Sequence, residues 1–341
     1  MTKTNLIATG LLCVIGALTN AKAELLAYEP FNYTAGTSLI GQNLGHGFVN
    51  PWTAGGNVNN SIIRSGSFTY TDTFGNSILN LGNRALITGD GSAAGDNTGG
   101  NNAGASPRRT LNFTRGTGAS PSTTWISLIA TRTGPAYPYI NSLGHTVNYG
   151  RGVGALQFFY NAAAPGNLTQ GNEILSIGRG SANSGEDPAL LHDSWALVNR
   201  GAAAQEAVSF SGFAALPPDF LLLRIDHAVG TAPHTNPSEA DTAYLWINPT
   251  SLAFAPTLNS ADVVFSPTAI DPTNDRDYVF NVLRLFGGSF NTTVGYSAVE
   301  VDEIKVGTAF LDVTLNAVPE PSMIALLGVG ALLFVVARRR K

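Results

Sequence analysis

The fold class of this chain is decided by residues 123–133, TTWISLIATRT. Apolar residues alternate along this segment, and a period of two places successive side chains on opposite faces of a strand. Residues 278–288, YVFNVLRLFGG, repeat the pattern with β-branched and aromatic residues, which favour strands. Both segments are therefore predicted to be strands with one buried face.

Shorter runs of the same composition continue outward along the chain, separated by Gly, Asn, Asp, Pro or Ser. The 38 glycines and 18 prolines among 341 residues indicate many turns and few long helices. We therefore predict an all-β protein, an antiparallel β-sandwich with helices only at its two ends. The expected strands are 67–71, 124–132, 156–160, 173–178, 220–227, 242–247, 278–286 and 298–306.

The body of the chain is acidic and has few charges. Charged residues make up 12% of the sequence, against about 25% in an ordinary soluble domain. Without the two terminal segments, the chain retains 13 basic and 22 acidic residues, a net charge of −9. Such a surface repels phosphate, so nucleic acid is not an expected partner. The single cysteine, Cys13, lies in the first 23 residues, which excludes disulfides and cysteine catalysis from the body.

Residues 1–23 have the features of a secretory signal peptide. Lys3 supplies the basic start, and residues 6–18 form an apolar helix too short to span a bilayer. Ala21 and Ala23 give the small-x-small pattern of the cleavage site. We therefore expect export through the inner membrane by the secretion machinery, followed by a body of residues 24–316.

The C-terminal segment, residues 317–341, combines three features in order. Pro319 and Pro321 disfavour helix, residues 323–337 are uncharged and mostly aliphatic, and four basic residues end the chain. As a helix the apolar part reaches about 22 Å, against about 30 Å for a hydrocarbon core. We expect a transmembrane helix that holds the inner membrane transiently, with its basic end in the cytoplasm. A permanently membrane-anchored adhesin is the alternative.

This tail resembles the PEP-CTERM sorting domain of exported bacterial proteins. The resemblance implies recognition by an exosortase, an integral-membrane cysteine protease or transpeptidase, and removal of the tail on the way to the cell surface or extracellular matrix. The sorting motif that it implies is Val318, Pro319, Glu320, Pro321 and Ser322, and the basic stop is Arg338, Arg339, Arg340 and Lys341.

Three phrases of the body resemble the concanavalin A-like, LamG or jelly-roll domains of such proteins. They are LLAYEPFNYTAGTSLIGQNLGHGFVNPWTAGG (25–56), LLLRIDHAVGTAPHTNPSEADTAYLWINPT (221–250) and VEVDEIKVGTAFLDVTLNAVPEP (299–321). The resemblance implies that YLWINP (244–249) is a strand meeting a turn. It also implies that DEIKVGT (302–308) is a closing strand beside the N-terminal one. It supplies no catalytic set.

The strongest enzymatic pattern is the acidic run Glu300, Asp302 and Glu303. Jelly-roll glycoside hydrolases of the laminarinase type carry E-x-D-x-x-E on one face of a strand, but here the third position is Lys305 and Glu303 points to the opposite face. We interpret the run as a solvent-facing strand near a sheet edge and expect no enzyme. The alternative is a glycan-active hydrolase whose carboxylates meet only in space. The adjacent residues 192–194, His-Asp-Ser, do not provide triad geometry.

Two oxygen-rich loops are candidates for a structural calcium ion, although Asx-turn residues are the alternative and neither loop has EF-hand spacing. The first loop contains Asp271, Asn274, Asp275 and Asp277, and the second contains Glu239 and Asp241. No other cofactor is expected.

The resemblance to jelly-roll domains implies a carbohydrate ligand, because carbohydrate binding is the common use of that fold. Trp52, Tyr137, Tyr139 and Trp195 are candidates for exposed rings that stack on sugars, whereas Trp125 and Trp246 lie in strand segments and are expected to fill the core. The sequence therefore predicts a non-enzymatic, exported protein of the cell surface or extracellular matrix. Its expected partners are an exosortase and an extracellular polysaccharide or other glycan.

Overall fold

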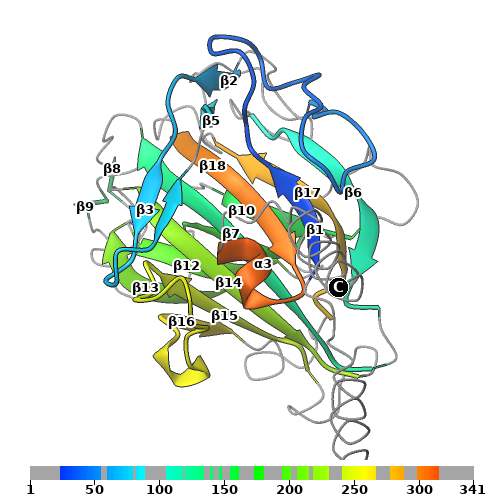
Figure 1. The fold of residues 1–341 in the computed structure, drawn as a ribbon, viewed down its shortest axis with the longest axis vertical. Coiled ribbons are helices and arrows are strands. Elements are labelled where there is room, and N and C mark those ends of the chain that lie inside the picture. The colour runs from blue at the N-terminus through cyan, green and yellow to red at the C-terminus, as the bar shows by residue number, and fades with distance from the viewer. Residues whose placement is uncertain are drawn as a thin grey trace, which may run out of the picture.

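A computed structural model of the chain describes residues 24–54, 60–79, 82–88, 105–117, 120–133, 139–140, 146–147, 154–160, 173–179, 194–200, 206–214, 218–229, 240–265, 277–287 and 298–314. These residues form two antiparallel sheets packed face to face, with α3 (Phe310–Thr314) in front of the larger sheet (Figure 1). The predicted all-β sandwich is confirmed.

The larger sheet has eight strands. One of them, β1 (Leu25–Glu29), joins the sheet by pairing with β18 (Ala298–Gly307). The order of the other seven is β16 (Val263–Phe265), β15 (Thr242–Ile247), β14 (Asp219–His227), β7 (Ser122–Thr133), β18 (Ala298–Gly307), β5 (Arg84–Thr88) and β2 (Ser61–Arg64).

The smaller sheet has six strands, and two short hairpins lie outside both sheets. The order of the six is β13 (Glu206–Ala214), β12 (Ser194–Arg200), β11 (Glu173–Arg179), β10 (Gly154–Phe159), β17 (Phe280–Phe286) and β6 (Arg108–Arg115). The hairpins are β3 (Thr69–Thr71) with β4 (Ser77–Leu79), and β8 (Tyr139–Ile140) with β9 (Thr146–Val147). A 3-10 helix, η4, covers Leu258–Ser260.

The main hydrophobic core lies between the two sheets. Ile126 and Leu128 of β7 and Leu221 of β14 are fully buried in it from the larger sheet. From the smaller sheet, Phe158 and Phe280 pack edge to face with ring centroids 5.0 Å apart. Alternate residues of the long strands supply this core, as the period of two predicts.

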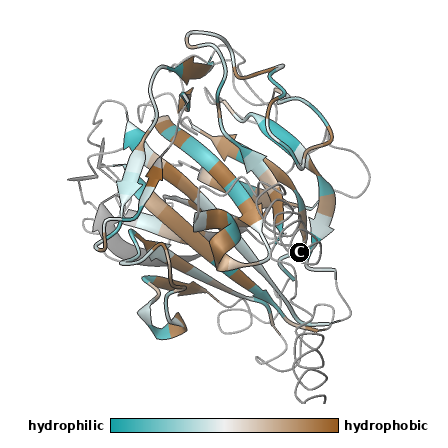
Figure 2. Ribbon diagram, viewed as in Figure 1, coloured by the Kyte–Doolittle hydropathy of each residue, from teal (hydrophilic) through white to brown (hydrophobic). Residues whose placement is uncertain are grey.

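The outer face of the larger sheet carries a second apolar cluster. Trp125 and Ile129 of β7 and Phe220 of β14 point away from the main core into this cluster. The side chains of α3, of the β3–β4 hairpin and of the loop after β15 cover them, and Figure 2 shows hydrophobic strand residues around α3. The expectation of one buried face is therefore wrong for β7, because a second layer of chain covers its outer side.

β18 is a central strand with a bulge. β7 pairs along one side of it, while β5 pairs with residues 298–301 and β1 with residues 304–307 on the other side. The register shifts between Asp302 and Lys305, and Glu303 adopts a φ of 50°, so the strand bulges where its neighbour changes. The pairing with β1 confirms the expected closing strand. The expectation of a solvent-facing acidic edge is wrong, since Asp302 and Glu303 are 0% and 6% exposed.

Each of the eight strands expected from the sequence overlaps an observed strand, and segment 242–247 has the same bounds as β15. The alternation did not predict several short or polar strands, which pairing with neighbours holds extended: β1, β2, β4, β5, β6, β8, β9, β12, β13 and β16. The expected signal helix and C-terminal helix lie outside the described residues. Within the described ranges, no helix is long and apolar enough to cross a membrane.

Candidate functional site

A hollow with a volume of about 610 Å³ opens on the outer face of the larger sheet, where β14 ends and β7 and β15 begin. Seven of the eleven residues that line it have polar side chains, and four of these side chains carry a hydroxyl group. The lining includes Ser122, Thr123, Arg224, Asp226, Thr242 and Tyr244.

Strand pairing sets these side chains in two rows. In the first row, Arg224 of β14 lies between Trp125 of β7 and Tyr244 of β15. In the second row, Asp226 lies between Thr123 and Thr242 on the same strands. Because successive residues of a strand alternate between faces, both rows belong to the outer face. The hollow is therefore a polar row next to an aromatic row.

A partly exposed ion pair joins the two rows. The Nε of Arg224 donates to Oδ1 of Asp226 at 2.7 Å, and the Thr123 hydroxyl donates to the same oxygen at 2.9 Å. The side chains of Arg224 and Asp226 are 25% and 31% exposed, so a ligand reaches both. A guanidinium carries five N–H donors and a carboxylate carries two oxygens. Each group therefore offers a ligand hydrogen-bonding capacity beyond these two bonds.

The aromatic row continues into a stack beneath the hollow. The guanidinium carbon of Arg224 lies 5.4 Å from the centroid of the Trp125 ring. Trp125 stacks on Trp246 with centroids 5.9 Å apart, and Trp246 stacks on Tyr244 at 6.1 Å. Trp125 and Trp246 are buried, which confirms their expected packing role. Tyr244 is half-buried and belongs to the lining, so it is the ring that a ligand meets.

A buried relay closes the sandwich behind the hollow. Nδ1 of His227 donates to the Asp241 carboxylate at 3.1 Å, and Nε2 of His227 lies 2.9 Å from the Thr124 hydroxyl. Carboxylate, imidazole and hydroxyl follow the order of a catalytic triad. Thr124 is fully buried, however, and its hydroxyl accepts a bond from Nε of Arg115 at 2.8 Å. No substrate reaches that oxygen, so the relay holds the strand ends together.

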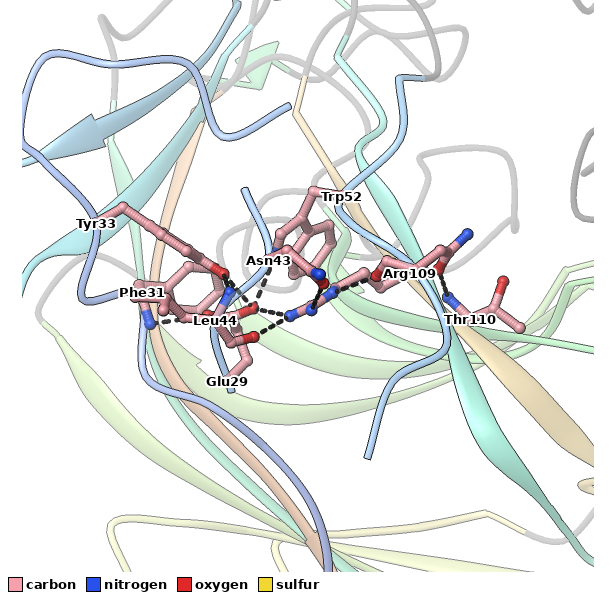
Figure 3. A network of polar contacts seen from close by, with 9 residues as sticks. Glu29, Phe31, Tyr33, Asn43, Leu44, Trp52, Arg109 and Thr110 are labelled. Atoms are coloured by element: carbon pink, nitrogen blue, oxygen red, sulfur yellow. Dashed lines mark hydrogen bonds and ion pairs between the residues drawn. The ribbon is translucent and has the colours of Figure 1, made fainter. Parts of the chain in front are cut away.

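A second polar network fixes the N-terminal segment to β6 (Figure 3). The Glu29 carboxylate is fully buried and accepts bonds from Trp52 Nε1 at 2.8 Å and from the Tyr33 hydroxyl at 2.9 Å. Arg109, 2% exposed, pairs with the same carboxylate and also donates to the Leu44 carbonyl at 2.8 Å. Burial raises the pKa of Glu29, and the Arg109 charge opposes that shift. No ligand has access, so this network is structural.

The tryptophans expected to stack on sugars are not exposed. Trp52 and Trp195 are each 1% exposed, and Trp195 Nε1 donates to the Asp219 carboxylate at 2.8 Å. Buried carboxylates thus satisfy both indole N–H groups, which is why these rings lie inside. Tyr137 and the side chain of Tyr139 lie outside the described residues.

The structure describes one residue of each loop that is expected to bind calcium, Asp277 of the first and Asp241 of the second. Asp241 binds His227, and its two oxygens also accept the backbone N–H groups of Ala228 and Tyr278, both at 2.8 Å. Of the first loop, only Asp277 is described; Asp271, Asn274 and Asp275 lie outside the described residues, as does Glu239. Among the residues that the structure describes, no three His, Cys, Asp or Glu side chains are grouped to hold a metal ion.

The acidic strand β18 is engaged within the protein. Glu300 pairs with Arg84, and Oδ2 of Asp302 accepts the backbone N–H of Phe68 at 2.8 Å. Glu303 accepts the Tyr28 hydroxyl at 2.8 Å and lies 2.9 Å from Nζ of Lys305. These carboxylates are therefore held by β1, β5, Lys305 and Phe68, and none of them lines the hollow.

The sequence did not single out Thr123, Arg224, Asp226 or Tyr244. The alternation in LLLRIDH (221–227) was a signal that Arg224 and Asp226 share one face. The third residue of each row comes from β15 and the first from β7, and no local pattern specifies that pairing.

The expected processing sites lie at the two ends, outside the described residues: Ala21 and Ala23, the sorting residues 318–322, and the basic residues 338–341. At the C-terminal end, the expected sorting motif is supported by a comparison with protein families. Residues 317–341 match the PEP-CTERM protein-sorting motif. The chain therefore carries the C-terminal sorting signal of exported, surface-directed proteins that an exosortase processes. No curated protein matches the chain.

Several solved structures align with most of the chain at low similarity. Domain 4 of the extracellular GH43 arabinanase AbnA from Geobacillus stearothermophilus, solved with arabinotriose, is 13% identical and covers 86% of this chain and 100% of its own, with a TM-score of 0.34. An endo-acting O-glycanase of the human gut microbiota is 11% identical over 84% and 99%, with a TM-score of 0.37. The family 7 alginate lyase A1-II′ is 10% identical over 71% and 83%, with a TM-score of 0.35.

Proposed function

We propose that this chain is an exported, non-catalytic protein of the cell surface or extracellular matrix, and that its body binds glycan through the hollow formed by β7, β14 and β15. The body is then a jelly-roll sandwich of the concanavalin A-like kind. The observation that carries the proposal is the pair of rows across three strands, Trp125–Arg224–Tyr244 and Thr123–Asp226–Thr242.

The chemistry of these rows suits a sugar. Neighbouring hydroxyls of a pyranose ring each donate and accept, and an arginine beside an aspartate offers both functions over a similar span. The apolar face of a sugar ring packs on an aromatic side chain, here Tyr244. Because Arg224 and Asp226 cancel each other in charge, the hollow favours a neutral sugar over an anionic one.

The two ends of the chain supply the route to the surface. The signal peptide directs export, and the sorting motif brings the chain to an exosortase while the apolar segment 323–337 holds the inner membrane. Removal of the tail then releases the body to the cell surface or matrix. A permanently anchored adhesin would keep the tail.

A non-catalytic role is supported by the state of the acidic groups. The carboxylates of β18 bind Arg84, Lys305 and the backbone, and the hollow contains a single carboxylate, Asp226, among the lining residues described. A glycoside hydrolase uses a pair of carboxyl groups across the scissile bond. Release of reducing sugar from a bound polysaccharide would favour the hydrolase alternative.

Glycan binding is tested by screening the purified protein against immobilised neutral and acidic glycans. The variants Tyr244→Ala and Arg224→Gln are each expected to weaken binding about tenfold, because each removes one or two contacts worth about 1 kcal/mol. Arg64→Gln, at an exposed arginine on β2, is the matched control and is expected to bind like the parent. Glycan binding that survives both hollow variants would contradict the proposed site.

Repeating the screen with a chelator tests the calcium ion that the sequence predicts in the loop of Asp271, Asn274, Asp275 and Asp277.

The sorting proposal is tested by measuring the mass of the mature protein isolated from its host. Glu320→Gln is expected to leave the tail attached, whereas the parent chain loses it. A parent chain that still carries residues 319–341 at the surface would support the permanent anchor instead.

A further inference from the structure

Two phenylalanines stand out on the surface of the described body. Phe74, in the turn between β3 and β4, and Phe254, in the loop after β15, are 73% and 75% exposed. An exposed aromatic ring lacks the hydrophobic stabilisation that burial would give, and exposed apolar patches mark interaction surfaces. Neither residue lines the hollow.

One buried carboxylate holds the two turns together. Oδ1 of Asp72 accepts the backbone N–H groups of Phe74 at 2.9 Å and Asn76 at 2.8 Å. Oδ2 of Asp72 accepts the backbone N–H of Leu252, in the other turn, at 2.7 Å. The Thr73 hydroxyl donates across to the carbonyl of Thr250 at 2.7 Å. The turn that carries Phe74 and the loop that carries Phe254 are thus joined by hydrogen bonds.

The two segments that carry the rings are uncharged. Residues 73–78 and 249–261 contain no Asp, Glu, Lys or Arg. These segments offer an ionic partner no charge to pair with, and a phenylalanine ring can stack on a sugar but cannot hydrogen-bond to it. Uncharged turns that carry projecting aromatic rings suit the boundary between lipid headgroups and acyl chains.

These turns lie on the same face as the point where the C-terminal segment leaves the body. Ile78 of the hairpin and Leu252 of the loop pack in one apolar cluster with Phe310 and Val313 of α3. The described body ends at Thr314, directly after that contact. Eight residues, 315–322, separate it from the apolar segment 323–337. Fully extended, eight residues reach about 28 Å.

We propose that Phe74 and Phe254 rest on the lipid surface of the membrane that holds the C-terminal segment, and so orient the body while the sorting motif is presented. The inference rests on the proposed function, because it requires the tail to be in a bilayer. With the tail inserted, the short connection keeps the outer face of the larger sheet near that bilayer. The two turns that carry the rings pack with α3 on that face.

The test uses the full chain with its tail, reconstituted into phosphatidylcholine vesicles whose acyl chains are either brominated or plain. Phe74→Trp and Phe254→Trp report contact with lipid, because bromine quenches indole fluorescence only on close approach. Val49→Trp is the matched control, since Val49 is 67% exposed and its N–H bonds to Thr110 of β6 in the smaller sheet. The four native tryptophans are at most 5% exposed, which gives a constant background.

Brominated lipid is expected to quench the indoles at positions 74 and 254 several-fold more than the indole at position 49. Equal quenching at all three positions, or none, with the protein bound to the vesicles would overturn the inference. A chain that fails to float with the vesicles contradicts membrane insertion of the tail itself, so the two failures are distinguishable. An emission shift at positions 74 and 254 on addition of polysaccharide would instead assign the rings to glycan binding. A shift that grows with protein concentration would assign them to contact with a second copy of the chain. An unchanged melting temperature of each variant shows that its fold is retained.

Discussion

Replacing Arg109 by methionine removes the cation that neutralises a fully buried carboxylate. Arg109 Nε donates to the Asn50 carbonyl at 3.0 Å, and its terminal nitrogens bind Glu29, the Leu44 carbonyl and Asn43. Methionine keeps most of the apolar stem of the side chain and makes none of these bonds. The variant therefore leaves the Glu29 carboxylate buried with neutral donors only.

The expected cost is large. Removing one partner of a buried ion pair costs about 3–5 kcal/mol, chiefly because the other charge is left uncompensated. Taking about 4 kcal/mol and a urea dependence of about 3 kcal/mol per M, the unfolding midpoint falls by roughly 1.3 M. The exposed fractions of 2% and 0% for Arg109 and Glu29 justify using the buried value rather than the surface value.

The cost also depends on pH, with a definite sign. Burial raises the pKa of Glu29, and the Arg109 charge opposes that shift in the parent protein. Without Arg109 the pKa of Glu29 in the folded state rises further above the unfolded value of about 4.3. A group with a raised folded pKa is tolerated when protonated and becomes destabilising as the pH rises through that pKa. The destabilisation by Arg109→Met is therefore smallest below about pH 4 and grows toward neutral pH.

Urea unfolding followed by circular dichroism at several pH values measures both effects. Arg64→Met, at an exposed arginine, is the control and is expected to change stability by less than about 0.5 kcal/mol. A loss below about 1 kcal/mol for Arg109→Met, or a loss that stays constant from acid to neutral pH, would refute the reasoning.

Three further substitutions test the fold. Gly116→Ala is expected to cost more than Gly75→Ala in thermal unfolding, because both glycines have a φ near +84° but only at Gly116 does an added Cβ lie 2.9 Å from a backbone carbonyl; equal losses would exclude a steric contribution. Trp125→Ala is expected to lose about 3–5 kcal/mol by removing a ring packed against α3, and a near-neutral denaturant midpoint would show that the outer layer is not packed. Trp195→Phe is expected to lose about 1–3 kcal/mol because Asp219 loses a buried donor; a neutral result would mean that another group replaces the indole.

The strands and their faces follow from local pattern to a large extent. TTWISLIATRT places Trp125 and Ile129 on one face and Ile126 and Leu128 on the other, and the structure keeps that division. What the pattern does not contain is the layer that covers the Trp125 face. That layer comes from residues far away in the sequence, such as Phe310, so burial on both faces was not predictable.

The candidate site shows the same division more sharply. Side chains such as Trp52 and Trp195, in segments without strand alternation, suggested exposed sugar-binding rings, yet each donates its N–H to a buried carboxylate that folding brings close. The residues that line the hollow were inconspicuous, because a lone Arg224 or Tyr244 has no chemical signature until the register of three strands aligns them.

The sequence by itself determined the class of fold, the long strands and the C-terminal sorting motif, because each depends on residues that are close together along the chain. A period of two specifies which side chains share a strand face, and the sorting motif is a linear signal at the C-terminus. Only the tertiary structure decided which faces are covered, which charges are buried and where a ligand can bind. Those properties depend on contacts between strands distant in the sequence, and no local pattern encodes them.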